Sequence, residues 1–325
     1  MVLLEISAEE AGQRLDKFLK KYLNMAPGSF VYKMLRKKNI KRNGKRADGS
    51  EKIVAGDTVA IYLSEETLAK FHQTKKAPVS AKGNLEILYE DDNVAIINKT
   101  AGMLSQKAEK HDVSLVEEFL AYLENKKNGT GMEADEKRRA FTPGICNRLD
   151  RNTSGLVVAG KTALGARKMS LLFKERNLKK YYLCIVKGRL TDTKHISGFL
   201  KKDEENNKVR VYKEAGVGRV KIETEYTPVT IGEKYTLLKV HLITGKTHQI
   251  RAHLGSIGHP IIGDRKYGEK EDNLFFEKKY GLTHQLLHAW QLVFPDMEEP
   301  FADLREKKIE APLPELFESI KADLF

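Results

Sequence analysis

The sequence has few cysteines and no long apolar segment. Cys146 and Cys184 are the two cysteines among 325 residues, so a disulfide framework is not expected. No apolar run approaches the roughly 20 residues of a transmembrane helix. Residues 1–6 lack the basic start and long apolar core of a signal peptide. These absences predict a cytoplasmic protein that does not cross a membrane.

The sequence also lacks the motifs of common cofactor sites. It contains no Gly-x-Gly-x-x-Gly dinucleotide motif and no Gly-x-x-x-x-Gly-Lys-Ser/Thr phosphate loop. His248 and His253 are five residues apart, a poor spacing for two metal ligands on one helical face. No cysteine or carboxylate accompanies them at a spacing typical of zinc sites. We therefore predict no cofactor and no metal.

Basic residues outnumber acidic residues. The 57 lysines and arginines against 45 aspartates and glutamates give a formal net charge of +12. This excess favours a polyanionic partner, nucleic acid or an anionic membrane, although a lysine-rich soluble surface gives the same total. At 325 residues the chain can form one large domain with a full core and a second, small domain.

The first 65 residues predict a small basic α/β module. Residues 11–23 have apolar positions at helical spacing, and a second helix follows the break at Pro27-Gly28-Ser29. Residues 33–46 contain eight basic residues and no acidic one, with the hairpin signal Asn43-Gly44 inside the run. We expect this face to follow a phosphate backbone, and the alternative is a solvated charged surface. The candidate RNA-binding residues are Lys33, Arg36, Lys37, Lys41, Arg42 and Lys45.

The remaining sequence predicts a linker and a large α+β domain. Residues 66–83 are polar with little periodicity, which indicates a linker before a domain over residues 84–325. Because the predicted strands follow one another without regular helical crossovers, the sheet should be mostly antiparallel with flanking helices. Strands are expected at residues 85–90, 93–98, 156–160, 179–186, 208–213, 219–228, 235–243 and 287–294. Helices are expected at residues 114–129, 162–176, 247–257 and 314–324.

Aspartates at two places in the large domain are candidates for catalytic work, on different grounds. Asp91-Asp92 lies between the first two strands of the large domain and fits turn residues better than an acid/base pair. Asp150 lies between Arg148 and Arg151, just before a turn and a buried strand. A nearby cation favours the ionised carboxylate, so Asp150 is a candidate nucleophile or base. The alternative is an ordinary ion pair in a turn.

Several separated motifs resemble one enzyme family, the RluA-type pseudouridine synthases. The matching segments occur in the family's order: Arg148-Leu149-Asp150 with Thr153-Ser154-Gly155, then Lys180-Tyr181-Tyr182, then Thr-Gly-Lys-Thr-His-Gln-Ile-Arg at residues 244–251, Gly258, Pro260, Gly263-Asp264 and Leu287-His288-Ala289. The first 65 residues resemble the RNA-binding domain first seen in small-subunit ribosomal protein four. That likeness rests on residues 14–19, the second helix through Ile40, Asn43-Gly44 and Gly56-Asp57.

This resemblance implies a function and a set of roles. The enzyme would detach uracil from ribose, turn it and rejoin it through carbon 5, without cofactor or metal. Asp150 would be the catalytic residue, attacking carbon 1 of the ribose, adding to carbon 6 of the base or removing a sugar proton. Tyr182 would stack on the uracil, and Arg251 would pair with Asp150. Arg148, Lys246 and His248 would contact the RNA. A monomer acting on ribosomal rather than transfer RNA is expected.

The sequence departs from the family pattern at three positions. Asn147 replaces the usual histidine, Thr100 replaces a proline, and Lys246 replaces an arginine. We expect activity to survive, with altered substrate contacts at Asn147 and Lys246 because lysine cannot form a bidentate fork. Thr100 gives up the fixed backbone of proline.

Two other functions remain as alternatives. A non-catalytic RNA-binding or ribosome-assembly factor would keep the fold as a clamp, but it should tend to lose one of Asp150, Tyr182 and Arg251. A hydrolase acting on a glycosidic bond usually needs two carboxylates flanking the bond, and no second acidic residue accompanies Asp150 in a motif.

Overall fold

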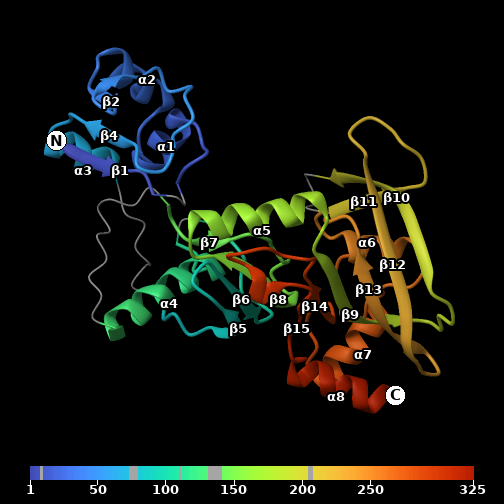
Figure 1. Cartoon of the computed structure of the whole chain (residues 1–325). Coiled ribbons are helices and arrows are strands. Elements are labelled where there is room, and N and C mark those ends of the chain that lie inside the picture. Colours follow the sequence, from blue (N-terminus) through green and yellow to red (C-terminus); the bar gives the residue numbers. More distant parts are fainter. Residues whose placement is uncertain (8–9, 73–79, 110, 131–140, 204–207) are drawn as a thin grey trace.

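The computed structural model describes residues 1–7, 10–72, 80–109, 111–130, 141–203 and 208–325. Within these residues the strands form a four-stranded sheet and an eleven-stranded sheet. Figure 1 shows the small sheet with its helices at one end of the molecule and the large sheet in the main body. No helix in the described ranges is long and apolar enough to span a bilayer.

The small sheet belongs to the N-terminal module. Its strand order is β1-β4-β2-β3, with every pair antiparallel. Asn43 and Gly44 have φ values of +48° and +72°, as expected for the predicted hairpin turn between β2 and β3. The elements are β1 (Val2–Glu5), α1 (Leu15–Tyr22), α2 (Gly28–Arg36), β2 (Ile40–Arg42), β3 (Lys45–Arg46) and β4 (Thr58–Ile61).

A helix that the sequence pattern does not predict begins the predicted linker. Helix α3 (Glu65–Phe71) starts after Ser64, whose Oγ accepts a hydrogen bond from Thr67 N at 3.2 Å. Phe71 packs against Phe30, with ring centroids 4.4 Å apart, so α3 returns to the N-terminal module. The helix has only seven residues and none of them is buried, so its sequence has no apolar stripe that would predict a helix. Residues 73–79 of the predicted linker lie outside the described residues.

The large sheet confirms the predicted α+β class. Its main order is β11-β10-β12-β13-β9-β14-β8-β6-β5, with β15 beside β14 and β7 beside β8. Among the described strands of this sheet every pair is antiparallel except β14 with β8. The strands are β5 (Glu86–Glu90), β6 (Val94–Lys99), β7 (Gly144–Ile145), β8 (Ser154–Gly160), β9 (Lys179–Lys187), β10 (Lys194–Asp203), β11 (Lys208–Tyr212), β12 (Val220–Ile231), β13 (Tyr235–Leu242), β14 (Leu287–Val293) and β15 (Lys308–Glu310).

Local signals place most of the flanking helices. Thr162 Oγ1 accepts from Gly165 N at 3.0 Å, and the Glu117 carboxylate accepts from Ser114 N at 3.1 Å, so both predicted helix starts are confirmed. Asp91 Oδ1 accepts from Asn93 N and Val94 N, each at 2.7 Å, as expected for a turn residue. The helices are α4 (Leu115–Thr130), α5 (Ala163–Glu175), α6 (Gln249–Ser256), α7 (Lys270–Tyr280), the 3-10 helix η2 (Ala302–Leu304) and α8 (Glu315–Leu324).

The sheet brings the motif segments together where β8, β14 and β9 meet. Gly155 has a φ of +106°, and a Cβ there would lie 2.2 Å from the Ala289 carbonyl oxygen. Glycine is therefore required for β8 to approach β14 this closely. The Asp150 loop precedes β8, Tyr182 lies on β9, and Arg251 lies on α6. These three segments surround one cleft.

Candidate active site

All three predicted catalytic residues line a single cleft of about 680 Å³. Among its described lining residues, Asp150 carries the only carboxylate. Basic side chains surround it, and a cleft of this kind attracts the phosphates of a nucleic acid. The cationic lining residues are Lys107, Arg148, Arg151, Lys174, Arg176, Lys180, Lys246 and Arg251.

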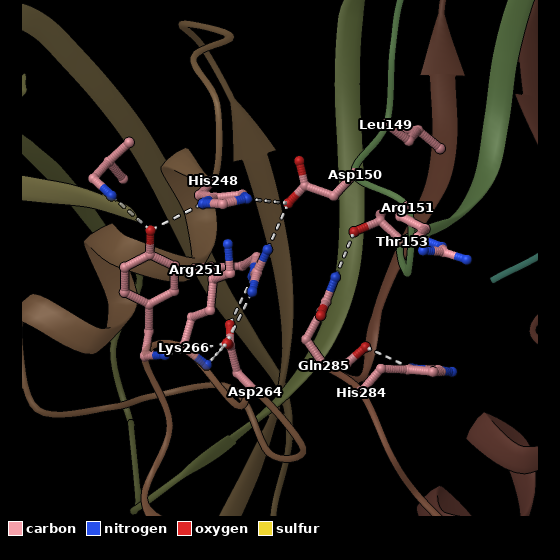
Figure 2. A network of polar contacts seen from close by, with 12 residues as sticks. Leu149, Asp150, Arg151, Thr153, His248, Arg251, Asp264, Lys266, His284 and Gln285 are labelled. Atoms are coloured by element: carbon pink, nitrogen blue, oxygen red, sulfur yellow. Dashed lines mark hydrogen bonds and ion pairs between the residues drawn. The ribbon is translucent and has the colours of Figure 1, made fainter. Parts of the chain in front are cut away.

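A chain of three charges forms the centre of the site (Figure 2). Arg251 Nη1 donates to Asp150 Oδ2 at 2.8 Å, across 101 residues of sequence. The same guanidinium donates to Asp264 from Nε at 2.7 Å and from Nη2 at 2.9 Å. The Arg251 side chain is 6% exposed and that of Asp264 is fully buried. The predicted pairing of Arg251 with Asp150 is therefore present.

Asp264 makes Arg251 a fixed cation. Burial alone would lower the pKa of Arg251, but hydrogen bonds from its guanidinium to Asp264 and the charges of Asp264 and Asp150 raise the pKa above its usual value. Backbone N–H groups of Lys266 and Tyr267 also donate to Asp264 Oδ1, at 2.9 and 3.1 Å. Arg251 thus cannot turn freely, and it holds one oxygen of Asp150. The Asp150 side chain is 24% exposed.

The arginines that flank Asp150 have other partners. Arg148 Nη1 donates to Gln106 Oε1 at 3.3 Å, and Arg151 Nε donates to the Gly102 carbonyl at 3.1 Å. Within the described residues neither forms an ion pair with Asp150. The expectation that the neighbouring arginines supply the cation beside Asp150 is therefore wrong. Successive side chains of the turn point in different directions, so Arg148 and Arg151 reach other partners. Arg148 is exposed and lies in the cleft lining, where the sequence analysis expected an RNA contact.

His248 lies beside Asp150 in a left-handed backbone conformation, with φ of +53°. Its Nε2 is 3.8 Å from Asp150 Oδ2, and its Nδ1 is 3.0 Å from the Tyr267 hydroxyl. That hydroxyl accepts from Val209 N at 2.9 Å, so its proton is available to Nδ1 and the ring proton is then on Nε2. Burial lowers the pKa of His248, against the opposing charge of Asp150. A neutral ring therefore faces the carboxylate.

Tyr182 is a buried residue of the cleft lining, and Lys246 is an exposed one. Tyr182 is 7% exposed and belongs to the main apolar core, so one part of its ring forms the cleft floor. Burial, and secondarily the Asp150 charge, raise the pKa of Tyr182 above its usual value, which keeps the phenol protonated. Lys246 is exposed at the rim, and its backbone N–H donates to Gln249 Oε1 at 3.1 Å.

The Asp150 loop is fixed by contacts that the sequence analysis did not foresee. Ser105 Oγ donates to the Leu149 carbonyl at 2.7 Å and accepts from Leu149 N at 3.0 Å. Gln285 Nε2 donates to Thr153 Oγ1 at 3.2 Å. Asn147, one of the family departures, accepts from Val158 N through Oδ1 at 2.8 Å. Asn147 therefore holds the loop against β8 while it also lines the cleft.

Lys99 is a second unforeseen support. Its fully buried ammonium donates to the carbonyls of Thr100, Met103 and Arg151, at 3.0, 2.9 and 3.0 Å. Burial lowers its pKa to about 8, with the Asp150 charge opposing. Lys99 therefore ties two loops together beneath Asp150. Its position at the start of the Lys-Thr-Ala-Gly segment is the sequence signal that could have identified it.

Asp264 is the site residue with the clearest missed signal. The motif Gly263-Asp264 supported the family resemblance, yet no role followed from it. Gly263 has a φ of +76°, and a Cβ there would lie 2.2 Å from the His284 carbonyl oxygen. This close turn places Asp264 under Arg251. The fully buried carboxylate does not line the cleft, so the described site lacks the second carboxylate that a glycosidic hydrolase needs.

The predicted cations of the N-terminal module lie outside the described cleft lining. Lys33, Arg36, Lys37 and Lys45 are exposed. Lys41 is partly buried, with Nζ 5.4 Å from the centre of the Tyr62 ring.

Arg42 has a different position from its neighbours. Its Nη2 pairs with Asp57 Oδ2 at 2.7 Å, and its side chain is 23% exposed. Because Asp57 is buried, this arginine serves the fold of the module, and its guanidinium is less available to RNA than the other cations.

Residues 93–256 match a family model described as RNA pseudouridylate synthase. The chain is 30% identical to the ribosomal large subunit pseudouridine synthase C of Vibrio vulnificus, covering 99% of this chain and 96% of that protein. It is 31% identical to the Escherichia coli protein of the same name, over 96% of this chain and 93% of the relative.

Solved structures show the same fold. Human RNA pseudouridylate synthase domain containing 4 superposes with a TM-score of 0.55 at 23% identity, covering 71% of this chain and 89% of that one. Human RNA pseudouridylate synthase domain containing 1 gives a TM-score of 0.51 at 22% identity, covering 75% and 96%.

Proposed function

The chain belongs to the RNA pseudouridylate synthase family, and from this premise we propose that Asp150 is its catalytic residue and that large-subunit ribosomal RNA is its substrate. The protein is an RNA pseudouridine synthase, an isomerase that converts uridine to pseudouridine in RNA. The observation that supports Asp150 is the charge chain Asp150–Arg251–Asp264 in the cleft.

Asp150 is suited to each first step open to it. Attack on carbon 1 of the ribose, addition to carbon 6 of the base and removal of a sugar proton all need an ionised carboxylate with an accessible oxygen. Arg251 binds Oδ2 and aims the group, and Oδ1 has no hydrogen-bond partner among the described residues. A preorganised cation of this kind costs little reorganisation during the reaction.

The other cleft residues are assigned to the nucleotide. Tyr182 presents part of a buried ring at the floor, where the flat face of uracil can stack. The uridine must leave its stack to reach this floor, as in other enzymes that modify bases. Arg148 is assigned to contact the extruded nucleotide or to fill its position in the RNA. His248 lies beside the carboxylate, and Lys246 lies at the rim.

The N-terminal module is assigned to binding the RNA backbone. Its exposed lysines and arginines offer a sequence-independent interaction with phosphates, which raises affinity and makes it depend on salt. Ribosomal RNA is proposed because relatives covering nearly the whole chain carry the name ribosomal large subunit pseudouridine synthase C. We propose that the enzyme acts in the cytoplasm and as a monomer.

Tritium release from RNA labelled at carbon 5 of uridine tests the proposal. Wild type, Asp150→Ala and the exposed turn control Asp92→Ala are incubated with RNA from cells that lack this enzyme. Release by wild type and the control, but not by Asp150→Ala, is expected, and mapping the modified sites identifies the RNA. Equal release by all three would overturn the role of Asp150. No release despite intact RNA binding would favour the non-catalytic clamp.

A further inference from the structure

The cleft contains a lysine for which the proposed chemistry has no use. Lys180 precedes Tyr182 by two residues on β9, so both side chains lie on the same face of the strand. Both line the cleft. Lys180 is partly buried, and within the described parts of the chain its ammonium has no carboxylate partner.

Three other buried or partly buried cations of the large domain have polar partners. The Lys161 side chain is 18% exposed and pairs with Glu90 at 2.7 Å. Lys99 donates to three backbone carbonyls. Arg251 has two carboxylates. Among the described residues Lys180 forms no ion pair, and taking a charge from water without a partner is unfavourable.

A second cation makes the imbalance larger. Arg176 follows α5 in a left-handed conformation, with φ of +63°, and also lines the cleft. Burial lowers the pKa of Lys180, and the charge of Arg176 lowers it further. Glu223 feels the charge of Arg176, but its carboxylate pairs with Lys221 at 2.6 Å. The two cations therefore repel each other, and neither forms an ion pair with a described residue.

Two residues of the cleft lining lie against the Lys180 ammonium. The Phe173 ring centre lies 6.0 Å from Lys180 Nζ on one side. The turn before α6 lies on another side, since a Cβ at Gly245 would be 3.7 Å from Nζ. Phe173 and Gly245 offer no side-chain anion, and both belong to the cleft lining. An incoming anion is the missing partner.

We propose that Lys180 and Arg176 form a subsite for one backbone phosphate next to the target uridine. The inference rests on the proposed function, in which the uracil stacks on Tyr182. Two residues of a strand span about 6.5 Å, similar to the separation between a base and its own phosphate. A phosphodiester at Lys180 would relieve the repulsion and fix the nucleotide with its base above Tyr182.

The experiment compares Lys180→Gln with Lys234→Gln, an exposed cation outside the cleft lining. Each protein is given RNA in which the phosphate on the 5′ or the 3′ side of the mapped target uridine is replaced by a neutral methylphosphonate. With normal RNA, Lys180→Gln should raise KM about tenfold, as expected for losing one charge-assisted hydrogen bond, and leave kcat within about twofold. Lys234→Gln should behave as wild type.

The neutral linkages identify the contact. One of them should raise the wild-type KM about tenfold but leave that of Lys180→Gln unchanged, because the lost charge and the lost phosphate are the same interaction. Arg176→Gln should show the same pattern at the same linkage. If neither linkage distinguishes Lys180→Gln from wild type, the subsite does not exist. A thermal melt equal to wild type shows that the variants fold.

A binding measurement tests the phosphate subsite without depending on catalytic activity. Binding of fluorescein-labelled oligouridylate is followed by anisotropy at several salt concentrations. Even if the protein made no pseudouridine, Lys180→Gln should weaken this binding and lower its salt slope by about 1, whereas Lys234→Gln should not. Equal slopes for the two variants would overturn the subsite independently of catalysis.

Discussion

The cleft and the N-terminal module arrange their charges in different ways. In the cleft, Asp150 meets Arg251 across 101 residues of sequence, and Asp264 joins them with little exposure of Arg251 or Asp264 to water. In the module, most candidate cations come from one run of sequence and remain exposed, while the buried carboxylates of Asp16 and Asp57 are satisfied by neighbours within the module. The first arrangement fixes geometry, and the second accumulates positive charge.

This difference predicts which measurement each region affects. A preorganised charge chain stabilises a transition state, so its changes should appear mainly in kcat. Exposed cations bind phosphates in the ground state and the transition state alike, so their changes should appear in KM and in salt dependence.

The largest effect is expected for Asp150→Asn. The amide keeps the shape of the side chain but removes the negative charge and the nucleophile, so kcat should fall by more than about 10³-fold. RNA affinity measured by anisotropy should change little, because phosphate contacts are untouched. Arg251 keeps its two hydrogen bonds to Asp264, so the melting temperature should also change little. Single-turnover tritium release measures the loss, and an active Asn variant would rule out nucleophilic or basic catalysis by Asp150.

Asp264→Asn should damage both stability and catalysis without touching the substrate. Breaking a buried ion pair on one side costs about 3–5 kcal/mol of unfolding free energy, since Arg251 is left partly uncompensated. The loss of its anchor should lower kcat by about 10–100-fold with KM almost unchanged. Urea unfolding and tritium release provide the two values.

Asp57→Asn is the matched control in the module. It removes a buried carboxylate that Arg42, Asn43 and the Val54 N–H contact. It should destabilise the module but leave kcat at saturating RNA unchanged. An equal loss of kcat in Asp57→Asn and Asp264→Asn would contradict the assignment of catalysis to the cleft and of RNA binding to the module.

Elements with local signals were predictable from the sequence. The turn at Asn43-Gly44, the cap at Thr162 and the turn at Asp91 each depend on residues within a few positions, and all three are present. Strand β10 and helix α7 were missed. Strand β10 has exposed residues near both ends and few buried ones, so it lacks a clear apolar alternation. Helix α7 has one buried residue, Phe276, so it lacks an apolar stripe.

The site was predictable only in part. Asp150, Tyr182 and Arg251 were identified through family motifs, and their convergence in one cleft is a tertiary fact that no spacing contains. The same limit explains why Arg148 and Arg151 were expected beside the Asp150 carboxylate. A sequence pattern indicates possible pairs between near neighbours, whereas the actual partner of Asp150 is Arg251, which lies 101 residues away.

Acid should affect the two regions at different pH values. Burial lowers the pKa of His253 and of His288 to about 4, with backbone hydrogen bonds opposing. Both ordinarily titrate near 6.5, so the unfolded chain binds more protons between about pH 6.5 and 4. The large domain should therefore lose stability as pH falls through this window, by up to about 1.4 kcal/mol per pH unit for each histidine.

The N-terminal module should keep its stability between about pH 6.5 and 4. Burial would raise the pKa of Asp16 and Asp57, but hydrogen bonds to each carboxylate lower it below its usual value. Their contribution is complete above about pH 3.9 and is lost only below it. Trp290, the single tryptophan, lies on β14 two residues from His288 and reports unfolding of the large domain.

Hydrogen exchange of the module provides the second signal in the acid experiment. His288→Gln should reduce the pH slope seen by Trp290 fluorescence and leave exchange in the module unchanged. Simultaneous unfolding of both regions with one pH midpoint would contradict the comparison.

The smallest effects are expected among the hairpin cations, and Arg42 and Lys45 separate two roles within one hairpin. Lys45 is exposed, so Lys45→Gln should raise KM about two- to fivefold, lower the salt slope by about 1 and leave kcat and the melting temperature unchanged. Arg42 is paired with the buried Asp57, so Arg42→Gln should instead lower the melting temperature of the module. If Lys45→Gln lowers kcat at saturating RNA, the module takes part in positioning the target uridine, and its exposed cations do more than bind phosphates.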